Sequence, residues 1–152
     1  MLGPGMSVEP SANLVAKTQG QPLRIAGVVT DRRCRPLSGA TLELWQTNAD
    51  GEYGPGHGTP EMRCCYLQGA VQTDAAGRYE VETIKPGPYK GEAPPPPAHI
   101  HVWVAHPNAQ SLSTELDFAD DPYLPADANA VLTLHEVPGG LSGTFDFVLT
   151  DR

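Results

Sequence analysis

The chain has 152 residues, a formal net charge of −8, 16 glycines and 16 prolines, which favours one domain of short elements over long helices. Its acidic balance, without a basic patch, argues against binding to nucleic acid or to an anionic membrane surface. No segment is apolar over the length that a membrane span needs, so the sequence predicts no transmembrane helix.

Residues 1–22 are polar and interrupted by proline and glycine, which predicts an N-terminal arm or tail. This segment has no charged stretch followed by an apolar one, the pattern of a secretion signal. The three cysteines do not make a disulfide framework, and the adjacent Cys64 and Cys65 lack the spacing of a zinc knuckle. Free thiols are typical of a reducing compartment, so we expect a cytoplasmic protein.

From residue 23 to residue 152 the sequence predicts one all-β domain. Short runs of β-branched and apolar residues alternate with turn residues, and no long window shows a helical period. This density of runs predicts an antiparallel β-sandwich of about seven to eight strands with long loops. The predicted strands are residues 23–30, 40–47, 69–72 and 78–84 (the last two as a hairpin around 73–77), 98–105, 130–137 and 143–150.

Two long irregular stretches, residues 48–70 and 85–97, interrupt the predicted strands. Long loops in a small domain are usually functional or disordered. Each of these loops carries a tyrosine among glycines and prolines, Tyr53 in the first and Tyr89 in the second. The second loop leads directly into the strand over residues 98–105, so we expect these loops to border a functional site.

The strand "AHIHVWVA" presents two histidines on the same face. Side chains alternate along a strand, so His99, His101 and Trp103 point one way while Ile100 and Val102 point toward the core. One interpretation is a half-solvated strand whose polar face is histidine. The other is a metal site, because two convergent neutral imidazoles suit iron, zinc or copper. The strand alone leaves both open.

Four segments taken together, "LELWQTNADGEYG", "QTDAAGRYEVETIKPGPY", "PAHIHVWV" and "TELDFADDPYL", resemble the intradiol ring-cleaving dioxygenases of the protocatechuate 3,4-dioxygenase and catechol 1,2-dioxygenase type. The resemblance covers roughly residues 22–150 and extends to order and spacing. It implies a non-haem Fe(III) held by Tyr53, Tyr89, His99 and His101. Tyr89 and His101 would be axial, Tyr53 and His99 equatorial, and a hydroxide or water would complete the shell.

The resemblance also implies an activity, the intradiol cleavage of a catechol by O2 to a cis,cis-muconate-type diacid that takes up both oxygen atoms. Tyr53 and Tyr89 would be the catalytic residues, and Tyr89 would leave the metal and take up a catechol proton. Phenolate oxygens are hard anionic donors, which favour Fe(III) over Fe(II). The implied partners are the small catechol and O2.

The sequence departs from the family pattern at two positions. Pro96 stands where an arginine usually precedes the "PAH" segment, and Glu115 stands where a glutamine is common. Arg63 and Arg78 are the candidates for a replacement cation. Without one, a more electron-rich ring that needs less activation is the expected substrate.

Two other functions are also compatible with the sequence. The first half of the chain also looks like transthyretin-like sandwiches, which are structural modules without an active site. An Fe(III)–tyrosinate enzyme with a different oxidation of a phenolic substrate would explain the missing arginine. Exposed sheet edges in a sandwich of this size also lead us to expect a homo-oligomer.

Overall fold

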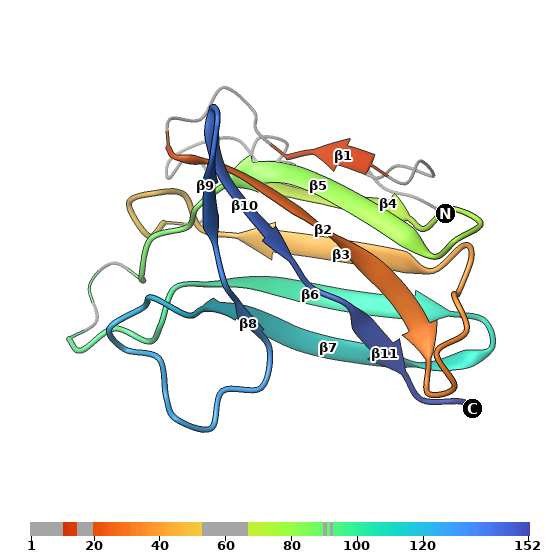
Figure 1. Cartoon of the computed structure of the whole chain (residues 1–152). Coiled ribbons are helices and arrows are strands. Elements are labelled where there is room, and N and C mark those ends of the chain that lie inside the picture. Colours follow the sequence, from red (N-terminus) through yellow and green to blue (C-terminus); the bar gives the residue numbers. More distant parts are fainter. Residues whose placement is uncertain (1–10, 15–19, 53–66, 90, 92) are drawn as a thin grey trace, which may run out of the picture.

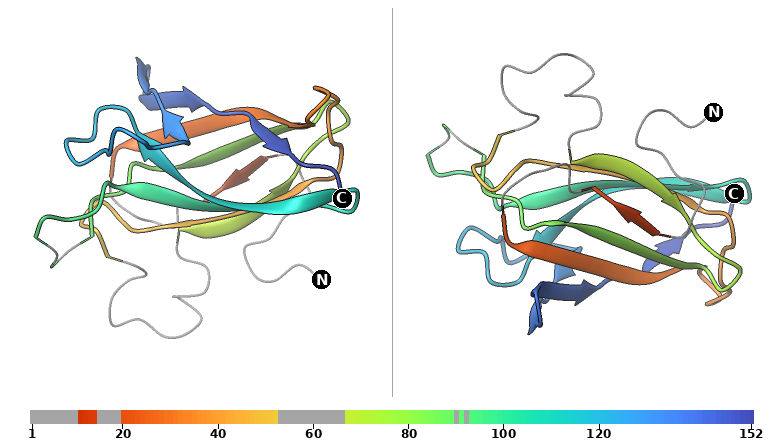
Figure 2. Two further views of the ribbon diagram at one scale, coloured as in Figure 1. Left: turned by 90° about the horizontal axis from the view of Figure 1, so that it is seen from below. Right: turned by 90° about the horizontal axis from the view of Figure 1, so that it is seen from above.

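The computed structural model describes residues 11–14, 20–52, 67–89, 91 and 93–152. Their backbone forms two β-sheets that stack as two layers (Figures 1 and 2). The described residues include no helix that could cross a membrane. The first sheet holds β1 (Ser11–Asn13), β5 (Arg78–Ile84), β2 (Pro22–Asp31), β10 (Gly140–Thr144) and β9 (His135–Val137) in this order, and β11 (Phe147–Leu149) pairs further along β2. The second holds β4 (Gln68–Gln72), β3 (Thr41–Gln46), β6 (His99–His106), β7 (Ala109–Phe118) and β8 (Val131–Leu132).

The predicted all-β sandwich is confirmed, with two differences of detail. The sheets are mixed, because β1 runs parallel to β5, β10 and β11 run parallel to β2, and β7 runs parallel to β8. The described residues also form eleven strands, more than the seven or eight expected, because several are only two or three residues long.

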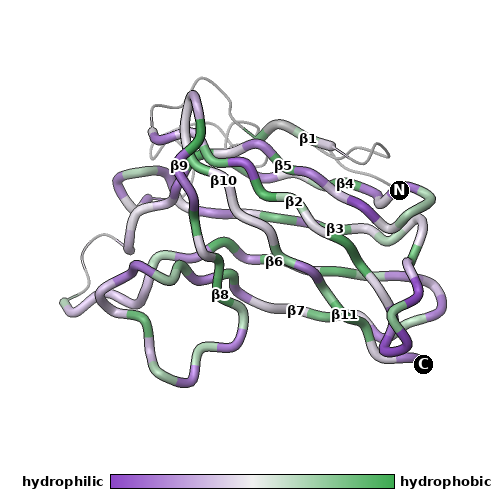
Figure 3. Tube along the Cα trace, in the orientation of Figure 1, coloured by the Kyte–Doolittle hydropathy of each residue, from purple (hydrophilic) through white to green (hydrophobic). Residues whose placement is uncertain are grey.

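The core lies between the two sheets and follows the alternation of the sequence. In β6, Ile100, Val102 and Val104 are fully buried, whereas Trp103 on the opposite face is half-buried. Figure 3 shows the same alternation as changes of colour along the strands. Because a strand repeats every two residues, burial of this apolar set fixes which side chains face outward.

The hairpin predicted for residues 69–72 and 78–84 is wrong. β4 pairs with β3 in the second sheet, whereas β5 pairs with β2 in the first. The turn between them therefore carries the chain from one layer to the other. Both strands have apolar faces, and each face is buried in the shared core, which local turn signals could not reveal.

Two predicted strands are each divided in the structure. Residues 130–137 form β8 in the second sheet and β9 in the first, so this segment also crosses between layers. Residues 143–150 are covered in part by β10 and by β11. The structure adds β7, a strand that was not predicted, because its outward face is serine, glutamate and aspartate and its inward face includes Thr114.

The division between β10 and β11 has a local cause at Phe145. The Phe145 carbonyl oxygen accepts a hydrogen bond from the Tyr79 hydroxyl at 2.7 Å and lies directly over Gly27. The next residue, Asp146, accepts the Val28 amide proton on its side chain at 2.9 Å. A side-chain acceptor thus replaces the backbone ladder, and pairing with β2 resumes only at Phe147.

Three five-residue turns share one construction, at residues 31–35, 48–52 and 74–78. In each, the first residue is Asp or Asn, and its side-chain oxygen accepts the amide protons of the third and fifth residues. The fourth residue has positive φ, which glycine adopts without strain, and it is Gly51 and Gly77 in two of the turns. The middle turn opens the loop that leads to Tyr53.

We predict that Gly27→Ala destabilises the fold by about 3 kcal/mol, because overpacking a tight contact carries a cost of this order. A Cβ there would lie 1.8 Å from the Phe145 oxygen and 2.9 Å from the Tyr79 ring. Gly39→Ala is the control, since a Cβ at position 39 would meet open space and only the φ of 73° disfavours a side chain. This backbone strain should lower the free energy of unfolding by about 1 kcal/mol. Denaturant unfolding measures both, and equal losses would contradict this packing account.

Candidate metal centre

The loops that follow β3, β5 and β7 leave the sandwich at the same end, where β6 begins (left in Figure 1). The cross-strand register places this start of β6 between its neighbours, with Trp45 opposite His101 on one side and Glu115 opposite His101 on the other. The start of β6 therefore lies at the end of the second sheet from which the loops after β3, β5 and β7 depart.

Three predicted site residues converge there. Tyr89 Oη lies 2.8 Å from His99 Nε2 and 3.2 Å from His101 Nε2, and the two Nε2 atoms are 3.2 Å apart. The His99 side chain is only 4% exposed, and that of His101 is 23% exposed. The structure thus brings together three of the four residues that the sequence singled out, and the fourth, Tyr53, lies outside the described residues.

Both imidazoles are oriented by their surroundings. His99 Nδ1 donates to the Pro97 carbonyl oxygen at 2.8 Å, which leaves the Nε2 lone pair directed at the point of convergence. The His101 ring stacks on Trp45, with centroids 5.1 Å apart and planes 9° from parallel. Burial lowers the pKa of His101, and His99 lowers it further against the opposing effect of Glu115. A lowered pKa favours the neutral imidazole, the form that binds metals.

The chemistry of these donors fits an iron ion. Two neutral imidazole nitrogens and a phenol oxygen within 3.2 Å of one another are donors that one cation can share. A deprotonated Tyr89 would supply a hard anionic oxygen, which favours the ferric over the ferrous ion. A proton must leave the phenol for this, and a bound cation lowers the pKa of its ligands.

A buried polar network anchors the backbone that leads to Tyr89. The Gln46 side-chain amide is nearly inaccessible and donates to the Ile84 carbonyl at 2.8 Å and to the Thr47 carbonyl at 3.2 Å. Its oxygen accepts from the Thr83 hydroxyl at 2.6 Å, and the Thr47 hydroxyl donates to the Gly87 carbonyl at 3.0 Å. The end of β3 therefore fixes the segment between β5 and Tyr89.

The loops that carry the two tyrosines are also joined directly. The Gly87 amide donates to the Asn48 carbonyl at 2.9 Å, and the same carbonyl accepts from the Gly51 amide at 3.1 Å. A Cβ at position 87 would lie 2.3 Å from the Ala49 oxygen, so glycine permits this close approach. The loop that leads toward Tyr53 and the loop that holds Tyr89 thus support each other.

Two carboxylates border the site. The sequence analysis singled out Glu115 as a departure from the family pattern, whereas it did not bring in Asp117. Glu115 Oε1 lies 3.8 Å from both His99 Nε2 and His101 Nδ1. The possible ligand atoms of His99, His101 and Glu115 all lie within 4.8 Å of one another. Asp117 is opposite His99 in the register. Burial raises the pKa of Asp117 and Glu115 raises it further, while His99 lowers it.

Arg78 and Arg63 were the two candidates to replace the arginine that the family pattern places at Pro96. Arg78 begins β5 at the end opposite to Tyr89, about 20 Å along the strand, and its Nε donates to Asp74 at 3.0 Å. Arg78 therefore does not reach the site, and that expectation is wrong. Arg63 lies outside the described residues. Pro96 is half-buried in the segment before His99.

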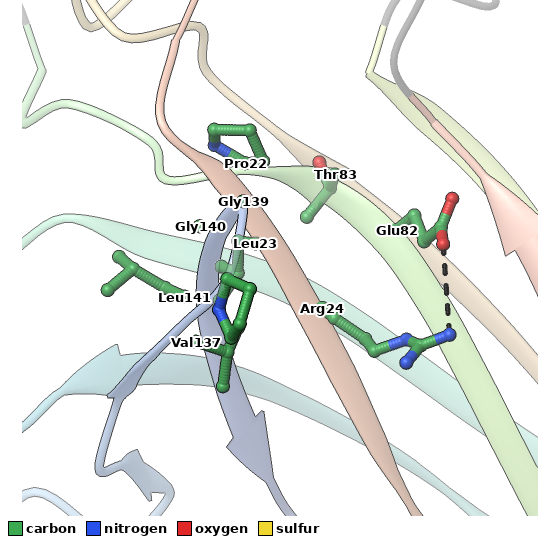
Figure 4. Close-up of a pocket in the computed structure, with 10 residues that line it drawn as sticks. Pro22, Leu23, Arg24, Glu82, Thr83, Val137, Gly139, Gly140 and Leu141 are labelled. Carbon is green, nitrogen blue, oxygen red and sulfur yellow. Dashed lines mark ion pairs between the residues drawn. The ribbon is translucent and has the colours of Figure 1, made fainter.

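A groove of about 490 Å³ lies elsewhere, on the first sheet beside the β9–β10 hairpin (Figure 4). Its walls include Pro22, Val137 and Leu141, and its charged residues, Arg24 and Glu82, form an ion pair at 3.9 Å. No pair of metal-binding side chains converges among these described residues. The donor cluster on the second sheet is accordingly the better candidate for chemistry.

Comparison with known proteins gives a consistent result. The family profile described as "Dioxygenase" matches residues 8–149. A catechol 1,2-dioxygenase of Candida albicans is 37% identical over 120 residues, which span 68% of this chain and 39% of that protein. This chain spans about two fifths of the length of this relative and of two further catechol 1,2-dioxygenases that it matches.

Solved structures share the fold over nearly the whole chain. The dioxygenase domain of a dioxygenase carbohydrate-binding protein fusion from Streptomyces sp. SirexAA-E is 32% identical, with a TM-score of 0.77 over 96% of this chain and 91% of that one. The 3-chlorocatechol 1,2-dioxygenase of Rhodococcus opacus 1CP is 25% identical, with a TM-score of 0.82 over 100% of this chain and 70% of that one.

We predict that Gln46→Met lowers the free energy of unfolding by about 2–3 kcal/mol. The substitution removes the hydrogen-bond partner of the buried Ile84 carbonyl and of the Thr83 hydroxyl. Hydrogen exchange of residues 84–89 should accelerate in the same variant. Gln110→Met is the matched control, since the Gln110 side chain is exposed and its one hydrogen bond among the described residues is to the Asp151 carbonyl. Unchanged exchange in residues 84–89 would show that Gln46 does not anchor the Tyr89 loop.

Proposed function

Because the chain belongs to the family of intradiol ring-cleaving dioxygenases, we propose that it cleaves a catechol ring between the two hydroxylated carbons with O2. The carbon–carbon bond breaks, each of its carbons becomes a carboxyl carbon, and both atoms of O2 enter the cis,cis-muconate-type product. The observation that supports this most is the convergence of Tyr89 with His99 and His101.

The proposed cofactor is Fe(III), held by Tyr53, Tyr89, His99 and His101. When bound, it would accept the two catechol oxygens and draw electron density from the ring, so that O2 can add to a ring carbon. His99 and His101 would keep their places throughout, because β6 is paired on both sides. Their neutral charge leaves the two phenolates to balance the cation.

Tyr89 is placed for a second role, as a base. It lies on a loop, is half-buried, and its anchored backbone ends at Gly87, two residues earlier. The side chain can therefore swing while the backbone behind it is held. If its oxygen were released from the cation, Tyr89 would be a base within reach of a bound catechol and would take up one of its protons.

A different oxidation of a phenolic substrate is the second candidate, favoured by Pro96 in the position where an arginine is expected. A structural module without a site is a weaker explanation, because such a module gains nothing from two histidines that converge with a tyrosine. A cytoplasmic location and a homo-oligomer stay predictions.

The experiment is O2 uptake by the iron-loaded protein with catechol, hydroxyquinol and a halocatechol. We expect uptake with catechol and hydroxyquinol, with hydroxyquinol fastest and the halocatechol slowest, because an electron-rich ring compensates for a missing cation. Binding of catechols without O2 consumption would favour the second candidate. A protein that takes up no iron during loading and consumes no O2 with any of the three compounds would favour the structural module.

We predict that His99→Ala and His101→Ala each lose most of the bound iron, because a strand paired on both sides cannot shift to replace a ligand. Metal analysis after iron loading measures this. His106→Ala is the control, since His106 ends the same strand and its Nε2 contacts the Ser38 carbonyl. Full iron content in both site variants would refute the assignment of these ligands.

Tyr89→Phe and Tyr53→Phe should behave differently, because only Tyr89 is proposed to act as a base. Both variants should weaken the visible absorption of the iron protein. Tyr89→Phe should also slow catechol deprotonation, at a cost in kcat of the order of 10²-fold, which rapid-mixing measurements without O2 can resolve. Equal deprotonation rates in the two variants would contradict a base role for Tyr89.

A further inference from the structure

In the part of the chain that the structure describes, the charge that borders the donor cluster is negative. Glu115 is opposite His101 across β6 and β7, and its Oε1 is 3.8 Å from a nitrogen of each imidazole. Its side chain is 53% exposed, in contrast to the buried His99. A molecule that binds at the convergence of the three donors therefore comes within a few ångströms of this carboxylate.

A second carboxylate stands next to it. Asp117 follows Glu115 on the same outward face of β7, opposite His99. Its Oδ1 is buried and makes no hydrogen bond among the described residues. A buried acceptor without a partner is costly, and a positive charge nearby would lower that cost without touching the atom.

No lysine or arginine of the described residues forms an ion pair with either carboxylate. Lys85, which lies at the same end of the sandwich, pairs with Asp120 at 3.1 Å. Asp121 is engaged by the Ala98 amide at 2.9 Å. The field at the donor cluster thus comes from Glu115 and Asp117 without a described cation to cancel it.

We propose that Glu115, supported by Asp117, makes the site selective for catechols whose ring side chain carries a protonated amine, and that it rejects catechols with a carboxylate. This inference rests on the proposed function, since it assumes that a catechol binds at the donor cluster. At a partly exposed site, attraction between unit charges a few ångströms apart raises the affinity about tenfold relative to a neutral catechol, and repulsion lowers it about tenfold.

The test compares three catechols that differ in one group at position 4: ethyl, 2-aminoethyl and carboxymethyl. Their affinities for the iron-loaded protein are measured by anaerobic titration, with tryptophan fluorescence as the signal, and their kcat/KM values by O2 uptake. Trp45 stacks on His101, so it reports binding at the cluster directly. The aminoethyl compound should bind about tenfold more tightly than the ethyl compound, and the carboxymethyl compound about tenfold more weakly.

Glu115→Gln should bring the three affinities to within about threefold of one another without loss of iron. Glu136→Gln, an exposed glutamate of β9 on the other sheet, should leave the order unchanged. The preference of the unmodified protein should also shrink as salt rises, because screening weakens charge interactions.

The carboxymethyl compound binding as tightly as the aminoethyl compound to the unmodified protein would overturn the proposal. An unchanged order in Glu115→Gln would do the same, and loss of iron in that variant would identify Glu115 as a metal ligand instead. If the binding order holds but none of the three compounds consumes O2, the proposed reaction fails while the charge selection stands.

Discussion

The site depends on the two-residue period of β6. Ile100, Val102 and Val104 are held in the core, so His99 and His101 must point outward from the same face. β3 and β7 pair with β6 on its two sides and bring Trp45 and Glu115 against the imidazoles. A slip of one residue would turn the two histidines toward the core between the sheets and the apolar set toward the outer face. The same burial that stabilises the sandwich therefore positions the two nitrogen donors.

The oxygen donor is positioned in a different way. Tyr89 lies on a loop, where no sheet register can fix it, and buried polar contacts replace the register. Gln46 and Thr47 bind the backbone before Tyr89, and Gly87 allows the two tyrosine-bearing loops to touch. Two imidazoles on a strand that is paired on both sides therefore face a phenol on a loop whose backbone is anchored up to Gly87. This arrangement suits the base role that we propose for Tyr89.

Sequence reasoning predicted what local patterns determine. The strands over 23–30, 40–47 and 98–105 alternate clearly, and the face shared by His99 and His101 follows from their spacing alone. It failed where long-range pairing decides: β4 joins β3 rather than β5, and β7 has too polar a pattern to stand out. Asp117 lies beside His99 because of a cross-strand register that no local pattern contains. The meeting of Tyr89 with the histidines could be expected from the family resemblance, but not from the residues alone.

The central claim is that this site cleaves a catechol between its two hydroxylated carbons and adds one oxygen atom of O2 to each of them. Turnover of catechol under ¹⁸O₂ with mass analysis of the product tests it most directly. The account predicts a ring-opened diacid in which both oxygen atoms of one O2 molecule are retained, one in each carboxyl group. A product with an intact ring, or with one labelled oxygen and the other released as water, would contradict it.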